Sequence, residues 1–293
     1  MTTTSPMYVI AESDHADEST SEAVTPKGDV TPVRVEIEFR GVSKAFGRKG
    51  EKDAPAVVKD LTFSIRKGEV VSLIGPSGCG KSTLLNMGSG LYSPTTGTVM
   101  VAGQEVKGPV KRVAFMLQKD LLMPWRTIEK NVEVGMEIAG VPRAERKAVA
   151  AEMLSKCHLS GFEKHYPFQL SGGMRQRAAL ARTLAMKPDV LFLDEPFSAL
   201  DAQTKMVLQQ DLAQTLHREK KTALFITHDL AEAVALSDRI LVMSSRPGTI
   251  IEEIDVTLPM RNDPLERRKL KETGPLIGRL MELLHVGKDN AMH

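Results

Sequence analysis

Two kinds of hydrophobic pattern occur along the chain. Residues 35–39 (VEIEF) and 61–65 (LTFSI) alternate apolar and polar positions, which is typical of strands with one exposed face. Residues 69–75 (EVVSLIG), 190–194 (VLFLD) and 223–227 (ALFIT) are nearly continuous apolar runs, as found in buried parallel strands. The contrast predicts an α/β fold whose mixed sheet has a parallel core and additional antiparallel strands.

Chemically useful residues follow each of the three apolar runs. A glycine-rich turn follows the first, Asp194 and Glu195 end the second, and His228 follows the third. Ligands of open α/β sheets bind at the carboxyl ends of the strands, so we expect these groups to converge at one edge. Asp229 and Glu232 have the spacing of a capping box and predict that a helix begins after His228.

Helical spacing dominates two other stretches. Residues 119–186 lack strand-like alternation and place Ile128, Val132 and Met136 four residues apart, which predicts a helical insert. Near the end of the chain, apolar residues recur at helical i, i+3, i+4 and i+7 spacing. This stripe favours a helix packed on its own domain, with a membrane-surface helix as the alternative. Its members are Ile277, Leu280, Met281 and Leu284.

These patterns divide the chain into three parts. Residues 1–33 are rich in Ser, Thr and acidic groups, which predicts a disordered leader; a binding role for it is the alternative. Residues 34–256 form the predicted globular domain and residues 257–293 a helical extension. Without an apolar run of about 20 residues or a signal-peptide pattern, we expect a soluble, cytosolic protein.

Composition narrows the partners. The 293 residues are 42% hydrophobic, and 39 Lys and Arg stand against 37 Asp and Glu, a net charge of +2. This balance does not produce the basic field of a nucleic-acid-binding protein, so no nucleic-acid partner is expected. Cys79 and Cys157 cannot make a disulfide framework, and their scarcity fits a reducing compartment.

The glycine-rich turn matches the phosphate-binding pattern G-x-x-x-x-G-K-[ST] between a predicted strand and a predicted helix. Its backbone N–H groups and the helix dipole would bind an anion, while Lys81 reaches the β- and γ-phosphates and Ser82 ligates Mg²⁺. The residues assigned to nucleotide binding here are Gly75, Pro76, Ser77, Gly78, Cys79, Gly80, Lys81, Ser82 and Thr83.

The strand-end carboxylates suit metal binding and proton transfer. Asp194 ends a buried strand, where it can hold Mg²⁺, and Glu195 can polarise an attacking water as general base. An acidic helix start with Pro196 at its first position is the alternative for this pair. For His228 the alternative to a catalytic role is an ordinary residue of a helix-capping turn.

The remaining motifs carry a family resemblance. Gln118 in MLQKD, LSGGMRQR at 170–177, LFLDEP, SALD at 198–201 and THD at 227–229 occur in one order with the phosphate loop. Over about residues 34–256 the chain resembles the ATP-binding subunits of ABC transporters. The resemblance implies a P-loop NTPase of ABC type with a helical subdomain at about 119–186.

The resemblance also implies how the nucleotide is held. Ser171, Gly172 and Gly173 would contact the γ-phosphate bound to a second copy of the chain or to a homologous subunit, so that two chains enclose two ATP molecules. Asp201 would pass between the two sites. On its own, a Ser-Gly-Gly segment is also a common flexible loop, and that alternative remains open.

Further roles follow from the same resemblance. Gln118 would ligate Mg²⁺, sense the nucleotide and meet the membrane subunit, and His228 would act as the γ-phosphate switch. Phe46 occupies the position, usually Tyr, that stacks on adenine; a core phenylalanine is the alternative. Because Cys79 lies inside the phosphate loop, a bulky thiol reagent is expected to block ATPase activity and ATP to slow the labelling.

Two departures from the family pattern carry expectations of their own. Gly88 and Gly90 are expected to loosen the end of the helix that follows the phosphate loop. Residues 120–127 (DLLMPWRT) resemble the subgroup that drives uptake of nitrate, sulfonates and taurine. In the alternative interpretation, Trp125 of this segment only packs in the helical insert.

Taken together, the motifs predict an ABC-type ATPase of an importer, with ATP and Mg²⁺ as cofactors and Lys81, Gln118, Glu195 and His228 as catalytic residues. Its expected place is the cytoplasmic face of the plasma membrane, bound to permease subunits that an extracytoplasmic solute-binding protein supplies. The main alternative is a soluble ABC ATPase acting on DNA. Such proteins carry long coiled coils or zinc modules, whereas only about 90 residues separate the phosphate loop from LSGGM.

Overall fold

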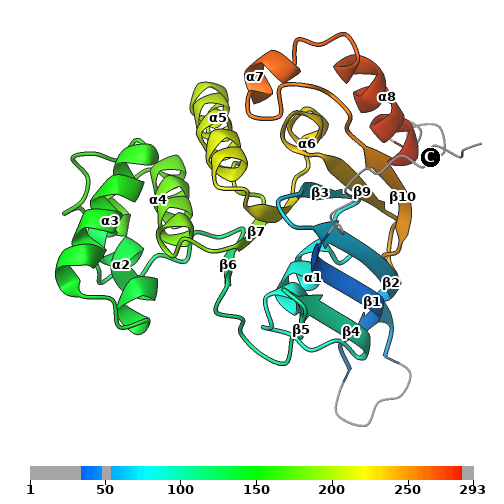
Figure 1. The fold of residues 1–293 in the computed structure, drawn as a ribbon, viewed down its shortest axis with the longest axis horizontal. Helices are drawn as coiled ribbons and strands as arrows, with labels where there is room; N and C mark the ends of the chain where they lie inside the picture. The colour runs from blue at the N-terminus through cyan, green and yellow to red at the C-terminus, as the bar shows by residue number, and fades with distance from the viewer. Residues whose placement is uncertain (1–33, 48–53, 286–293) are drawn as a thin grey trace, which may run out of the picture. The chain divides into compact units, whose positions relative to one another are not determined.

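A computed structural model describes residues 34–47 and 54–285. The predicted leader, residues 1–33, and the end of the predicted extension, residues 286–293, lie outside the described residues. The described strands form two sheets, a smaller antiparallel one and a larger mixed one (Figure 1).

The smaller sheet has the order β2-β1-β4-β5 and is antiparallel throughout. The alternation read from the sequence places Phe39 of β1 and Phe63 of β2 on one buried face, where their rings stack with centroids 4.6 Å apart. Both strands continue beyond the predicted segments. The strands are β1 (Val35–Ala45), β2 (Ala56–Arg66), β4 (Thr96–Val101) and β5 (Gln104–Glu105).

The larger sheet has the order β10-β9-β3-β8-β7-β6. Its neighbours pair in parallel from β9 to β6, and β10 adds an antiparallel edge, so the predicted mixed sheet with a parallel core is confirmed. The strands are β3 (Val70–Ile74), β6 (Val113–Met116), β7 (Val190–Asp194), β8 (Thr222–Ile226), β9 (Arg239–Met243) and β10 (Ile250–Asp255). Because β3, β8 and β7 are adjacent and parallel, their carboxyl ends meet at one edge.

Residues 117–189 contain the helices predicted between β6 and β7. The helices α2 (Ile128–Ile138), α3 (Arg143–Lys156) and α4 (Gly172–Ala185) contact one another, and Figure 1 shows them grouped in green. A short 3₁₀ turn, η1 (Pro167–Gln169), precedes α4. The apolar positions read at four-residue spacing on α2 are buried among these helices.

The C-terminal half contributes four more helices, α5 (Ala202–Arg218), α6 (Leu230–Leu236), α7 (Pro264–Arg267) and α8 (Thr273–Leu283). The predicted apolar stripe of α8 packs on its own domain, because fully buried Leu280 lies in one cluster with Ala233 and Val234 of α6. Met281 is the exception and is 45% exposed. Within residues 34–47 and 54–285, no helix has both the length and the hydrophobicity required to cross a bilayer.

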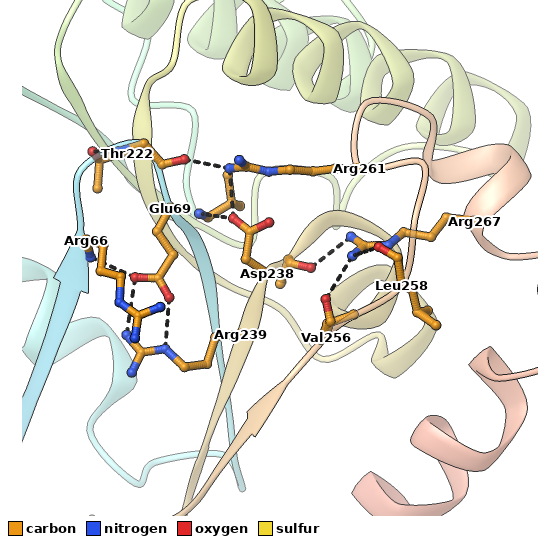
Figure 2. Close-up of polar contacts among 12 residues, drawn as sticks. Arg66, Glu69, Thr222, Asp238, Arg239, Val256, Leu258, Arg261 and Arg267 are labelled. Atoms are coloured by element: carbon orange, nitrogen blue, oxygen red, sulfur yellow. Dashed lines mark hydrogen bonds and ion pairs between the residues drawn. The ribbon is translucent and has the colours of Figure 1, made fainter. Parts of the chain in front are cut away.

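Arginines of the segment after β10 form hydrogen bonds and ion pairs with the larger sheet and its connections (Figure 2). The Arg261 guanidinium donates to the Gly68 carbonyl oxygen at 2.6 Å and pairs with Asp238 at 2.7 Å. Asp238 also accepts a hydrogen bond at 2.7 Å from the backbone N–H of Val70, the first residue of β3. The C-terminal segment is therefore bonded to the turn before β3 and, through Asp238, to β3 itself, the strand that leads into the phosphate loop.

The expectation that Gly88 and Gly90 loosen the end of helix α1 (Lys81–Gly88) is wrong. A Cβ atom on Gly88 would lie 2.6 Å from the Phe192 ring, and one on Gly90, where φ is +82°, would lie 1.9 Å from the Gly108 carbonyl oxygen. These glycines are needed because neighbouring groups approach closely, so they tighten the packing of this helix end.

Candidate functional site

The phosphate loop connects β3 to α1. Gly80, with φ of +105°, caps the helix in a left-handed conformation that favours glycine, and Lys81 is the first helical residue. The Lys81 side chain is buried, and its ammonium group donates to the carbonyl oxygens of Gly75 at 2.7 Å and Pro76 at 2.9 Å. Its charge therefore lies within the loop, at the positive end of the α1 dipole.

Asp194 and Glu195 lie at the carboxyl end of β7 in different surroundings. Asp194 is 4% exposed, and burial raises the pKa of its carboxyl group. A hydrogen bond with the Ser82 hydroxyl opposes this rise, as do the charges of Lys81 and His228. The Glu195 charge adds to the rise. Glu195 adopts a left-handed φ of +50°, which is unfavourable for a non-glycine residue and recurs at functional sites.

The Glu195 carboxylate, which follows β7, contacts side chains that follow two other strands. One of its oxygens lies 2.7 Å from His228 Nε2, after β8, and the other accepts from Gln118 Nε2 at 3.0 Å, after β6. The fold thus brings together Gln118, Glu195 and His228 as expected from the sequence. A carboxylate held by a hydrogen bond on one oxygen and an ion-pair contact on the other is fixed in orientation, which suits a group that must align a water molecule.

A cavity of about 330 Å³ lies against this cluster. Most of its lining was predicted from the sequence; Val57 of β2 was not, and it shows that the smaller sheet contributes a wall. The lining residues are Val57, Ser77, Gly78, Gly80, Lys81, Ser82, Thr83, Gln118, Glu195 and His228.

The same groups fit a magnesium ion. Within the described ranges, no cluster of three or more His, Cys, Asp and Glu side chains could hold a metal by itself. Mg²⁺ prefers oxygen ligands and commonly takes one or two protein groups together with substrate phosphates. The Ser82 hydroxyl, the buried Asp194 carboxylate and the Gln118 amide oxygen supply that kind of set beside the phosphate loop.

The residues of the LSGGM motif lie elsewhere. Ser171 caps α4 by accepting from the Met174 backbone N–H at 3.3 Å. A Cβ on Gly173 would lie 3.3 Å from both Ala199 and Leu200, so the motif packs beside the SALD segment. Asp201 caps α5 by accepting from the Thr204 backbone N–H. Hydrogen bonds from Thr204 hold the pKa of the Asp201 carboxyl below its usual range. None of these predicted residues lines the cavity of their own chain.

Gln176 was missed by the sequence analysis. This buried α4 residue donates to the Glu195 carbonyl oxygen at 2.9 Å and accepts from the Ala199 backbone N–H at 2.8 Å. It therefore ties the helix that begins with the LSGGM motif to the strained Glu195 backbone. Its place inside LSGGMRQR is the only sequence signal that could have indicated it.

Phe46 is not a core residue. Its ring is 52% exposed at the end of β1, meets Tyr92 edge-on with centroids 5.5 Å apart, and has the Lys44 ammonium 5.1 Å from its centroid. An exposed face can accept a stacking base, so the adenine role stays open and the core alternative is excluded. Phe46 lies outside the lining of the phosphate cavity.

Cys79 differs from the expectation of a reactive thiol. It is 1% exposed, and burial raises the pKa of its thiol while the Lys81 charge opposes the rise. Cys157 is also buried, with its pKa raised to about 12.

Because a higher pKa leaves less thiolate at pH 8, we expect the native protein to react slowly with a thiol reagent, with or without ATP. Colorimetric titration should then find both thiols after unfolding in urea. Rapid labelling of Cys79 in the native protein, slowed by ATP, would contradict this expectation and support the reactive thiol expected from the sequence.

Gly248, between β9 and β10, supports the phosphate loop from outside. It exchanges backbone hydrogen bonds with β2 at Val57 and Lys59, and a Cβ atom on it would lie 2.1 Å from the Cys79 carbonyl oxygen. Gly248→Ala should therefore displace the loop and raise the KM for ATP about tenfold, the usual scale of an overpacking penalty. Steady-state ATPase kinetics measure this.

The control for Gly248 is Gly274→Ala in α8, where nothing lies within 4 Å of an added Cβ. We expect this control to leave the KM unchanged. Equal kinetics of the two variants would show that Gly248 does not shape the phosphate loop.

Groups suited to binding phosphate and to activating water meet at a single sheet edge, and this places the domain in the class of P-loop nucleoside triphosphatases. A sequence profile described as ABC transporter matches residues 58–198. The chain belongs to the ATP-binding proteins of ABC transporters, and it is an ABC-type ATPase.

Relatives named for a transported solute and uncharacterised relatives agree on this family. An uncharacterised ABC transporter ATP-binding protein of Methanocaldococcus jannaschii is 43% identical over 79% of this chain and 86% of its own. The nitrate import ATP-binding protein NrtD of Synechocystis is 41% identical over 80% and 88%, and the taurine import ATP-binding protein TauB of Yersinia pestis 40% over 73% and 84%. The alternative of an ATPase acting on DNA has no support among these relatives.

A solved structure shares the fold and binds nucleotide. The dimeric ATP-binding cassette MJ0796, in a post-hydrolysis state with ADP and Pi, superposes with a TM-score of 0.68 at 32% identity, covering 75% of this chain and 98% of that one. The fold expected from the sequence is confirmed by this similarity.

Proposed function

We propose that this chain is the ATP-hydrolysing subunit of an ABC importer for a small anion such as nitrate, a sulfonate or taurine. The observation that carries the proposal is the Glu195 carboxylate, held between Gln118 and His228 beside the phosphate loop. The import relatives NrtD and TauB support the direction of transport and the class of solute.

The chemistry follows from the positions of these groups. The loop N–H groups and Lys81 bind the β- and γ-phosphates, with Lys81 exchanging its carbonyl partners for phosphate oxygens. Glu195 orients a water molecule and accepts its proton, while His228 donates to the γ-phosphate. Ser82, Asp194 and Gln118 would hold Mg²⁺, which neutralises charge developing on the phosphate oxygens.

A second copy completes the site in this proposal. The LSGGM residues lie outside the cavity of their own chain, and the Ser171–Gly173 segment stands at the exposed N-terminus of α4. A glycine-rich helix start binds anions, so the γ-phosphate can be shared by two chains. The dimeric state of the MJ0796 cassette supports this arrangement. ATP then closes the dimer and hydrolysis releases it.

Exposed apolar side chains of the helical region fit contact with a permease. Trp125 is 74% exposed and Phe168 is 76% exposed, and Tyr166 stacks on Phe168. The Ile128 backbone N–H donates to the His165 carbonyl oxygen at 2.8 Å, which brings the two segments together. Exposed apolar side chains on a surface mark interaction sites. The exposure of Trp125 excludes the alternative that it only packs in the helical insert.

The subunit then belongs on the cytoplasmic face of the plasma membrane, held there by its permease. An extracytoplasmic solute-binding protein would select the solute, and this chain would contact it only through the permease. The sequence DLLMPWRT, which carries Trp125, supports the nitrate, sulfonate and taurine subgroup.

Uptake measurements test the proposal. Deleting the gene should abolish uptake of labelled nitrate, taurine or an alkanesulfonate, and the wild-type gene should restore it. Trp125→Ala should fail to restore uptake while the purified variant keeps its basal ATPase activity, because the substitution removes a docking side chain. Met281→Ala, an exposed apolar change on α8, is the control and should restore uptake. Unchanged uptake of every such anion after deletion would exclude this solute class.

A further inference from the structure

The helix α6 begins two residues after His228, with Asp229 as its N-cap, and the C-terminal segment contacts its far end. Arg267 is 1% exposed. Its guanidinium donates at 2.8 Å to the carbonyl oxygen of Ser237, the residue that follows α6. It also donates to the carbonyl oxygens of Val256 at 3.1 Å and Leu258 at 3.0 Å (Figure 2). This arginine therefore fixes the end of α6 against the chain that leaves β10.

The next residue, Arg268, is linked to the other end of α6 by a series of polar contacts whose middle members are buried. Arg268 donates to Gln209 Oε1 of α5 at 2.6 Å, and the Gln209 amide nitrogen donates to the Glu232 carboxylate at 2.9 Å. Glu232 pairs with Lys205 at 2.8 Å, and Lys205 also donates to Asp229 at 2.8 Å. Asp229 is the residue after His228.

The Gln209 amide in the middle of this series of contacts must keep one orientation. Gln209 is 0% exposed and Glu232 is 2% exposed, so neither can exchange its partners for water at low cost. An amide offers one acceptor oxygen and one donor nitrogen. Arg268 occupies the Gln209 oxygen and thereby keeps the amide nitrogen on Glu232. Two cations and two carboxylates balance the charge along the chain.

The turn that carries His228 is bonded on both sides. The Asp229 carboxylate accepts from the Glu232 backbone N–H at 3.0 Å, while its own backbone N–H donates to the Thr227 hydroxyl at 3.0 Å. The capping box expected from the sequence is therefore only half formed. Glu232 does not return to the Asp229 N–H, since it is engaged by Lys205 and Gln209 instead.

We infer that Arg268, Gln209, Glu232 and Lys205 are positioning residues that hold His228 against Glu195, and that the C-terminal segment thereby sets the rate of ATP hydrolysis. The inference rests on the proposed function, in which His228 acts on the γ-phosphate. Lys81 and the loop N–H groups stand outside this chain of contacts, so nucleotide binding is independent of it.

Steady-state ATPase kinetics of the full chain test the inference. Arg268→Leu and Gln209→Met should each lower kcat about tenfold with an unchanged KM for ATP, the scale expected when a reacting group is misplaced. Arg268→Lys, which can still donate to Gln209, should recover most of the rate. Lys269→Leu is the matched control: this exposed neighbour pairs with Glu266 and should keep the wild-type rate.

A double-mutant cycle with His228→Ala separates positioning from general damage. If Arg268 acts through His228, adding Arg268→Leu to His228→Ala should cause no further loss of kcat. Additive losses, or a wild-type kcat for both Arg268→Leu and Gln209→Met, would overturn the inference. A wild-type rate for His228→Ala alone, or no ATPase activity in the wild-type chain, would instead refute the proposed function.

Discussion

Glu195→Gln is expected to abolish ATP turnover while leaving ATP binding intact. The amide keeps the shape of the side chain and can still lie between Gln118 and His228, but it cannot accept a proton from water. We expect kcat to fall by about a hundredfold or more, the scale of a lost general base. Because hydrolysis is the step that opens the proposed dimer, the variant should accumulate as an ATP-bound dimer in size-exclusion chromatography.

Glu219→Gln is the matched control for this change. Glu219 follows α5, is exposed at the surface and faces Arg218 and Lys221, so its loss should affect neither turnover nor assembly. Normal turnover by Glu195→Gln would remove Glu195 as the base. Loss of nucleotide binding would instead assign Glu195 a role in holding ATP.

Arg267→Met should give the largest loss of stability. The substitution keeps the apolar stem of a side chain that is 1% exposed but removes the donors to the carbonyl oxygens of Ser237, Val256 and Leu258. Buried acceptors left without a partner and the loss of charge-assisted bonds predict a decrease of about 3 kcal/mol in the free energy of unfolding. Urea denaturation followed by circular dichroism measures it.

Arg279→Met provides the comparison on α8. The Arg279 side chain is 52% exposed and pairs with Glu252 at 3.0 Å, so its removal should cost less than about 1 kcal/mol. Equal losses for the two arginines would mean that the buried bonds of Arg267 do not stabilise the fold. A loss confined to ATPase activity would point to a local effect on α6.

The elements with strong local signals were readable from the sequence. The apolar runs that became β3, β7 and β8 and the glycine-rich loop before Lys81 each show as a pattern within a few consecutive residues. Short strands were missed, among them β6, which spans only four residues and offers too few positions for a periodic pattern. The separation of β1 and β2, together with β4 and β5, into a second sheet was not readable, since alternation indicates a strand but does not identify its partner.

For the candidate site, the sequence by itself determined which groups are present and in which order they follow the strands. Only the tertiary structure decided which of them meet. Gln118 and Glu195 are 77 residues apart and bond because β6 and β7 are neighbours in the sheet. Long-range packing likewise buries Cys79, brings Gly248 against the phosphate loop and joins Arg268 to Gln209 of α5. Motif spacing is set by short-range backbone geometry, whereas burial and contact depend on how distant segments pack, and that information is spread over the whole chain.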